Sequence, residues 1–210
     1  QLSTSSMTAA GISSLVIAGL RKFQGAEEIR GAPLSISGLQ TWLALPDGGE
    51  EVAPAFSHTL GEDLPLLDWE GVSGRLIIGD LHGLRAPVKT ATETLYADIR
   101  LAPGARFQIP ATAEERAIYV LEGAVEIAGE TFPSDRLLVF RPGDETVVEA
   151  QTGAHFMLFG GAALGSRRYI WWNFVSSSKE RIEQAKEEWR TGRFDIVPGD
   201  EEEFIPLPEK

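Results

Sequence analysis

The chain of 210 residues contains no cysteine, and this absence excludes several kinds of chemistry at once. Without a thiol there is no disulfide framework and no thiolate nucleophile. A chain without disulfides suits a reducing compartment, so we expect a cytoplasmic protein.

Basic residues are scarce relative to acidic ones. The sequence has 19 Lys and Arg against 31 Asp and Glu, which gives a formal net charge of −12. A surface of this charge repels a phosphate backbone, so we expect no direct nucleic-acid partner. Part of the charge lies in the acidic run at residues 200–203, which we interpret as a solvated tail.

The sequence also lacks a long hydrophobic segment at its start. The apolar run at residues 11–20 is about half the length that a membrane-spanning helix needs. No Lys or Arg precedes it, so it lacks the basic start of a secretory signal, and we predict no membrane association. We interpret the run as a buried strand or helix. Because residue 1 is Gln rather than Met, we expect a processed, trimmed or partial chain.

Histidine is rare as well: only His58, His82 and His155 occur, and none lies within four residues of another. No local stretch therefore presents two imidazoles to one metal ion. A site assembled in space from these three residues stays an alternative. Otherwise we expect His58 and His82 to lie in loops and His155, at the start of a strand, to make a local hydrogen bond.

Three acids, Glu114, Glu115 and Glu122, could supplement a metal site, but isolated carboxylates on loops are normally solvated.

Motifs for other chemistry are missing too. No G-x-S-x-G motif is present, and neither a P-loop nor a G-x-G-x-x-G motif follows a strand. The sequence therefore favours neither nucleophilic hydrolysis nor phosphate binding.

What the sequence does contain is a series of short alternating strands. Residues 96–161 include the runs YADIRLAPGARFQIP, ERAIYVLEGAVEIAGE, RLLVFRPGDETVV and HFMLFGG, separated by Gly-containing turns. This rhythm is typical of a closed antiparallel β-barrel. Such barrels often carry a metal, yet Pro110, Thr112 and Glu114 occupy the stretch where histidines would lie.

The pattern predicts individual elements. We expect a strand at 94–101 with one face in a core and one in water, because Tyr96, Asp98 and Arg100 alternate with apolar residues. We interpret residues 25–37 as polar and turn-like, and 50–70 as a connecting segment. Further strands are predicted at 38–46, 74–79, 116–121, 124–128, 136–140, 145–149 and 155–159.

One helix is predicted near the end of the sequence. Ser177 precedes Glu180 by three positions, which is the spacing of a capping box. Ile182, Ala185 and Trp189 then recur at helical spacing and form the expected buried side. Gly192 is expected to end the helix.

Four of these segments, in order, resemble the pirin family, whose members are two-barrel proteins of the cupin superfamily. GLQTWLALP at 38–46 is similar to the strand that closes a pirin's first barrel, and residues 71–105 resemble the opening of its second barrel. ERAIYVLEGAVEIAGE at 115–130 resembles a strand–turn–strand unit of that second barrel. Residues 169–194 resemble the C-terminal segment of bacterial pirins.

The resemblance implies an all-β fold: a cupin or jelly-roll β-barrel with a partial N-terminal β unit and one C-terminal α-helix. It divides the chain into three parts. Residues 1–70 are expected to be a remnant of the N-terminal cupin domain plus a linker. Residues 71–165 are expected to form the C-terminal cupin barrel. Residues 166–210 are expected to hold a C-terminal strand, the helix and the acidic tail.

The resemblance also bears on the metal. In pirins three histidines and a glutamate of the first barrel hold the metal, usually iron, and an H-P-H element supplies two of them. That element would precede the turn that residues 7–11 resemble, so no ligand position is carried onto this chain. We therefore assign no catalytic, cofactor-binding or metal residue and expect no cofactor here, although full-length members bind Fe or another divalent metal.

Two functions follow as hypotheses. The first is a non-catalytic, metal-free cupin module with a structural or protein-binding role. The alternative is a metal-dependent oxidoreductase of the quercetin 2,3-dioxygenase type, which would need an open metal site built from His58, His82 and His155.

The resemblance finally predicts a partner. The strand at 38–46 and the segment at 167–175, with Trp171 and Trp172, would normally pack beside the first barrel. Without most of that barrel, strand edges and aromatic faces would lack cover and tend to find another chain. We therefore expect a homo-oligomer or a protein partner bound through exposed strand edges and Trp171/Trp172.

Overall fold

The computed structural model describes residues 3–9, 12–18, 38–53, 55–194 and 204–208. The chain divides into two compact units. The larger unit contains residues 58–163, and the smaller contains residues 40–57 and 164–210; parts of the first 39 residues belong to each. The predicted turn-like region at 25–37 and the acidic run at 200–203 lie outside the described residues.

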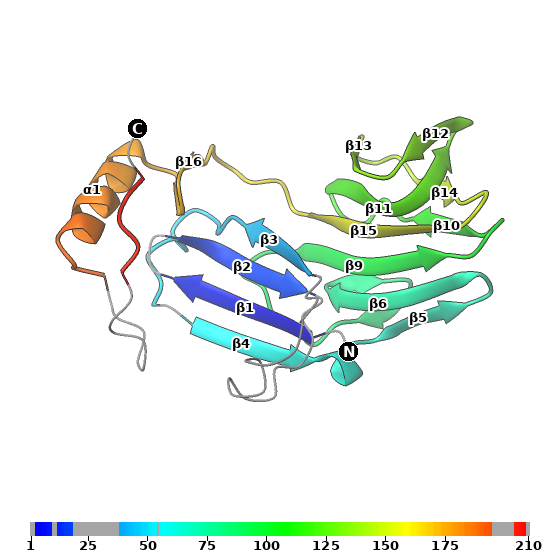
Figure 1. The fold of residues 1–210 in the computed structure, drawn as a ribbon, viewed down its shortest axis with the longest axis horizontal. Coiled ribbons are helices and arrows are strands. Elements are labelled where there is room, and N and C mark those ends of the chain that lie inside the picture. The colour runs from blue at the N-terminus through cyan, green and yellow to red at the C-terminus, as the bar shows by residue number, and fades with distance from the viewer. Residues whose placement is uncertain (1–2, 10–11, 19–37, 54, 195–203, 209–210) are drawn as a thin grey trace, which may run out of the picture. The chain divides into compact units, whose positions relative to one another are not determined.

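The larger unit is built on a curled antiparallel sheet of nine strands (Figure 1). The strand order is β10-β14-β11-β15-β9-β6-β5, and β12 and β13 each pair with β11. The strands are β5 (Leu66–Trp69), β6 (Val72–Ile78), β9 (Thr94–Leu101), β10 (Arg106–Ile109), β11 (Glu115–Ile127), β12 (Glu130–Pro133), β13 (Arg136–Phe140), β14 (Thr146–Glu149) and β15 (Ala154–Gly161). A short hairpin of β7 (Asp80–Leu81) and β8 (Leu84–Arg85) connects β6 to β9.

Apolar side chains fill the inside of this curled sheet. Because side chains alternate along a strand, each strand sends every second residue to the interior. Phe107 and Phe156 meet there edge to face, with 6.2 Å between ring centroids. The most completely buried members of the core are Leu76, Ile99, Phe107, Ile109, Ile118, Val120, Val125, Val148, Phe156 and Leu158. The all-β prediction with a single C-terminal helix is confirmed.

Strand β9 has the predicted bounds but not the predicted exposure. Only Arg100 is exposed, whereas Tyr96 and Asp98 on the expected wet face are buried. β9 lies between β6 and β15, and the carboxylate of Asp98 contacts His155 of β15. A partner of this kind allows a polar side chain to stay buried, so the alternation of polarity did not indicate contact with water.

Strand β11 corrects a second prediction. The expected strands at 116–121 and 124–128 are one continuous strand that runs through Glu122-Gly123, and its pairing with β15 shifts register between Val120 and Glu122. Gly123 has a φ of +74°, and a Cβ there would lie 2.2 Å from the carbonyl oxygen of Gly153. The register shift leaves Leu121 without a partner on β15, which is the pattern of a β-bulge, and a bulge bends a strand without ending it.

The segment at 50–70, expected to be a connection, contains secondary structure. It holds β4 (Ala55–Leu60), a 3₁₀ turn (Gly61–Asp63) and β5. β4 is the edge of a second sheet of order β3-β2-β1-β4, whose other strands are β1 (Ser3–Ala9), β2 (Ile12–Ala18) and β3 (Leu39–Leu43). β2 and β3 confirm strands within the runs at 11–20 and 38–46.

The smaller unit contains a hairpin and the helix. The hairpin pairs β16 (Tyr169–Trp171) with β17 (Phe174–Ser176), and α1 (Lys179–Arg190) follows. Ser178, not Ser177, caps the helix, because its side chain accepts a hydrogen bond from the backbone N–H of Arg181. Gly192 follows the end of α1 with a φ of +66°, as predicted.

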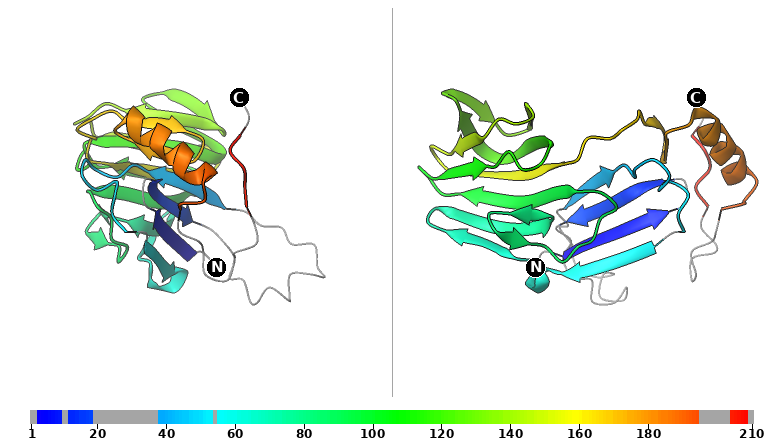
Figure 2. Two further views of the ribbon diagram at one scale, coloured as in Figure 1. Left: turned by 90° about the vertical axis from the view of Figure 1, so that its left-hand side faces the viewer. Right: turned by 180° about the vertical axis from the view of Figure 1, so that it is seen from behind.

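An aromatic cluster joins the hairpin to α1. Figure 2 shows the ribbon of the chain from two further sides. Phe174 is buried at its centre, stacked on Trp171, and Trp189 of the helix contacts Trp172 edge to face. Trp171 and Trp172 are therefore half-buried against their own helix. The cluster therefore supplies part of the cover that these faces were expected to lack, and a partner bound at Trp171/Trp172 stays a prediction.

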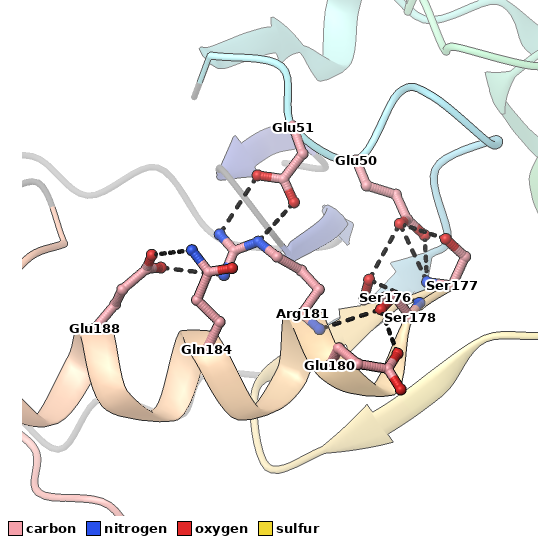
Figure 3. A network of polar contacts seen from close by, with 9 residues as sticks. All are labelled: Glu50, Glu51, Ser176, Ser177, Ser178, Glu180, Arg181, Gln184 and Glu188. Atoms are coloured by element: carbon pink, nitrogen blue, oxygen red, sulfur yellow. Dashed lines mark hydrogen bonds and ion pairs between the residues drawn. The ribbon is translucent and has the colours of Figure 1, made fainter.

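Polar contacts fix the start of the helix (Figure 3). The carboxylate of Glu50 accepts hydrogen bonds from the backbone N–H and the hydroxyl of Ser177 and from the hydroxyl of Ser176. Arg181 donates to Glu51 and to Glu188. The segment that carries Glu50 and Glu51 is thereby tied to α1.

No helix in the described part of the chain is long and apolar enough to cross a membrane.

Candidate functional site

Four polar residues gather on three adjacent strands of the larger unit. Asp98 and Arg100 lie on β9, His155 on β15 and Glu122 on β11, and these strands are neighbours in the sheet. In the strand register His155 lies opposite both Arg100 and Glu122. Alternation places all of them on the face opposite to the apolar core. The sheet thus assembles charges that lie up to 57 residues apart in sequence.

His155 and Asp98 form the buried centre of this group. Nε2 of His155 lies 3.1 Å from Oδ1 of Asp98, and both side chains are nearly nine-tenths buried. A proton on Nε2 makes the ring a donor to the carboxylate and leaves Nδ1 as an acceptor. The local hydrogen bond expected for His155 is wrong, because its partner lies on another strand.

Glu122 and Arg100 form the exposed rim of the group. Oε1 of Glu122 lies 3.9 Å from Nδ1 of His155, and its other oxygen lies 3.6 Å from Arg100. Nδ1 is buried and has no hydrogen-bond partner within the described residues. The imidazole therefore lies between two carboxylates, and a protonated ring would have an acceptor or ion-pair partner on each side.

A surface groove of about 620 Å³ runs beside these residues. Its polar lining comes from Asp68, Ser73, Arg100, Glu122 and His155, and Trp69 adds an aromatic side chain. A groove of this size suits a small polar molecule. Chemically, the group can bind a charged or hydrogen-bonding molecule.

The other two histidines lie elsewhere. His82 lies in the turn between β7 and β8, as expected, and its Nε2 is 2.9 Å from the carbonyl oxygen of Gln108. Its ring contacts Trp69 and Phe107 edge to face. His58 is exposed on β4, so the prediction of a loop is wrong there; the segment forms the edge of a sheet.

The structure therefore brings only one predicted acid, Glu122, close to a predicted histidine. Glu114 accepts a hydrogen bond from the backbone N–H of Ala163, and Glu115 is exposed at the start of β11. Within the described ranges, no three His, Asp or Glu side chains are placed to share one ion. These residues do not fit the four-ligand centre that the family resemblance implies.

Sequence reasoning missed Asp98 and Arg100 as members of the group. The sequence did contain an indication, because Asp98 and Arg100 are charged residues at alternate positions of a mostly apolar strand. The pairing of β9 with β15 could not be read from that indication, and only this pairing brings Asp98 to His155.

Comparison with known proteins finds one family model, whose match begins in the larger unit and extends through α1 of the smaller one. Residues 96–195 match the pirin C-terminal cupin domain. The chain is 41% identical to a pirin-like protein of Caulobacter vibrioides over 189 residues, which are 90% of this chain and 64% of that protein. It is 34% identical to a Pseudomonas aeruginosa protein provisionally named quercetin 2,3-dioxygenase, over 81% of this chain and 56% of that protein.

A solved structure supports the fold. The crystal structure of quercetin 2,3-dioxygenase from Acinetobacter baumannii matches with a TM-score of 0.76 at 21% identity, over 100% of this chain and 76% of that one. The cupin jelly-roll prediction is thereby confirmed. The chain spans 64% and 56% of the length of the two relatives named above.

Proposed function

We propose that this chain, which belongs to the pirin family, serves as a metal-free cupin module with a structural or protein-binding role. The proposal rests on the packing of the barrel interior. A metal-dependent barrel needs polar ligands that point inward, whereas Phe107, Ile118 and Phe156 fill this interior and are at most 1% exposed. Apolar packing of this density favours a scaffold.

The proposal concerns this chain and not the longer relatives. The activities of those proteins belong to their full lengths, of which the chain spans about two-thirds or less. We further propose a cytoplasmic location, since a chain without cysteine has no disulfide that an oxidising compartment would maintain. Its partner, in this proposal, is a protein bound through a strand edge.

The alternative function is a quercetin 2,3-dioxygenase, and the provisional name of the Pseudomonas relative is what favours it. The test is oxygen-dependent consumption of quercetin by the full chain after loading with Fe, Ni, Cu or Mn. We expect no turnover with any of them. Turnover that disappears in the variant His58→Ala/His82→Ala/His155→Ala would establish the alternative and overturn the proposal.

A further inference from the structure

Strand β13 has an unpaired edge. It pairs with β11 on one side, from Arg136 opposite Val120 to Phe140 opposite Arg116, and with no other described strand. The N–H and C=O groups of its other edge are therefore open to another strand. Natural sheets usually blunt such an edge with charges or proline along its length.

Arg136 at the start of β13 is the one charged side chain within the strand, and the four residues that follow it are apolar. Leu138 and Phe140 pack against the core of the larger unit. Leu137 and Val139 point away from that core and are 57% and 74% exposed. Two exposed aliphatic side chains on an open edge are the features of a surface that another strand covers.

The ends of the strand carry opposite charges. Asp135 precedes it and Arg141 follows it, and both are exposed. The hydroxyl of Tyr119 donates to one carboxylate oxygen of Asp135, which positions this side chain. No described residue forms an ion pair with Arg141.

These features make the sequence DRLLVFR at 135–141 complementary to itself. In an antiparallel pair centred on Leu138, Asp135 faces Arg141 of the second copy. Leu137 then faces Val139 of the second copy. Because the pair has two-fold symmetry, each contact occurs twice, as in an isologous dimer interface. Opposite charges and paired aliphatic side chains are the cross-strand contacts that stabilise antiparallel sheets.

We infer that a second copy of this chain binds along β13, antiparallel and in register about Leu138. The inference names the partner in the binding role proposed above and rests on that role. An extended peptide of another protein would satisfy the open backbone groups and the aliphatic pair. It would match both Asp135 and Arg141 only if it carried the opposite charge at each end.

Sedimentation velocity of the full chain across the micromolar range tests the inference. We expect a reversible monomer–dimer equilibrium, and Val139→Lys should raise its dissociation constant at least tenfold. Ile170→Lys is the matched control, because Ile170 is 70% exposed but lies in the smaller unit. This control should leave the dissociation constant unchanged, and far-ultraviolet circular dichroism should show both variants folded.

A charge exchange tests the register. Arg141→Asp alone should weaken the dimer, because it places two carboxylates opposite one another. The double variant Asp135→Arg/Arg141→Asp should restore it, since the two pairs are then reversed. A chain that stays monomeric, a dimer that Val139→Lys leaves intact, or a double variant no tighter than Arg141→Asp would each overturn the inference.

The inference and the proposed function fail separately. A metal-free monomer would overturn the dimer and leave the scaffold role in place. A dimer that consumes quercetin would overturn the scaffold role and leave the interface in place.

Discussion

Charged side chains are tolerated inside this sheet where a neighbouring strand or loop satisfies them. Arg116 is 1% exposed, and its guanidinium donates to the carbonyl oxygens of Pro110, Arg141 and Asp144. Asp98 and His155 satisfy one another across two strands. A buried polar group that loses its partner keeps its desolvation penalty, so these pairs hold the sheet in one register.

The first residue-scale prediction concerns Asp98. Asp98→Ala should lower the free energy of unfolding by about 1–3 kcal/mol, because Nε2 of His155 stays buried without its acceptor. Glu122→Ala should lower it by less than about 0.5 kcal/mol, since that carboxylate is 72% exposed. Urea titration measures both, and equal losses would contradict the role given to the buried pair.

The second residue-scale prediction concerns Gly123 of β11, which pairs with Ala154 just after the register shift. Gly123→Ala should destabilise the chain by about 2 kcal/mol or more, because it adds a clash with the carbonyl oxygen of Gly153 to a strained φ. Gly129→Ala is the control: its φ is +83°, but nothing lies within 4 Å of the added Cβ. It should therefore lose only about 1 kcal/mol. Thermal unfolding compares the two, and a control that loses as much as Gly123→Ala would refute the clash.

At the scale of elements, patterns of polarity predicted strands better than their connections or exposure. The alternation at 94–101 located β9 correctly, because period two is a local property. The burial of Tyr96 and Asp98 depends on packing and on the partner strand, which the local pattern does not contain. Glu122-Gly123 was interpreted as a turn because glycine is typical of turns, whereas Gly123 takes its positive φ inside a paired strand.

The site was less predictable than the fold for the same reason. His155 and Glu122 were recognised as candidate ligands, but not as neighbours, because only the β11–β15 register places them opposite one another.

The helix, by contrast, was predicted from local sequence alone. Its buried residues Ile182 and Ala185 followed from helical spacing alone, and the cap was misplaced by one position within a run of three serines.

A pH prediction belongs to the helix. Hydrogen bonding from Gln184, with the charge of Arg181, lowers the pKa of Glu188 below its ordinary value. A carboxyl whose pKa is depressed in the folded state stabilises that state above the ordinary pKa, and the contribution is lost as pH falls through the depressed value. Because Gln184 and Arg181 lie on α1 itself, acid should destabilise the end of the helix that carries Trp189.

Tryptophan fluorescence during acid titration measures this destabilisation. Glu188→Gln should flatten the acid-dependent change, because the titrating carboxyl is gone. Glu130→Gln, which changes an exposed carboxyl of the larger unit, should leave the titration curve as in the parent chain. Identical curves for the parent and Glu188→Gln would rule out this carboxyl as the origin of the acid response.

At the scale of the whole molecule, the apolar core of the larger unit and its candidate binding surfaces are formed by different residues. The apolar interior stabilises the curled sheet, while the charged group around His155 and the open edge of β13 lie on its surface. A cupin barrel arranged in this way can serve as a scaffold whose binding properties depend on surface residues alone.

The metal content of the chain tests the central claim most directly. The full chain is incubated with Fe²⁺ under anaerobic conditions, passed through a desalting column and measured by plasma mass spectrometry, and the same is done with Ni²⁺, Cu²⁺ and Mn²⁺. A metal-free module predicts far less than one ion per chain in every case. One tightly held ion per chain, lost in the variant His58→Ala/His82→Ala/His155→Ala, would contradict the account.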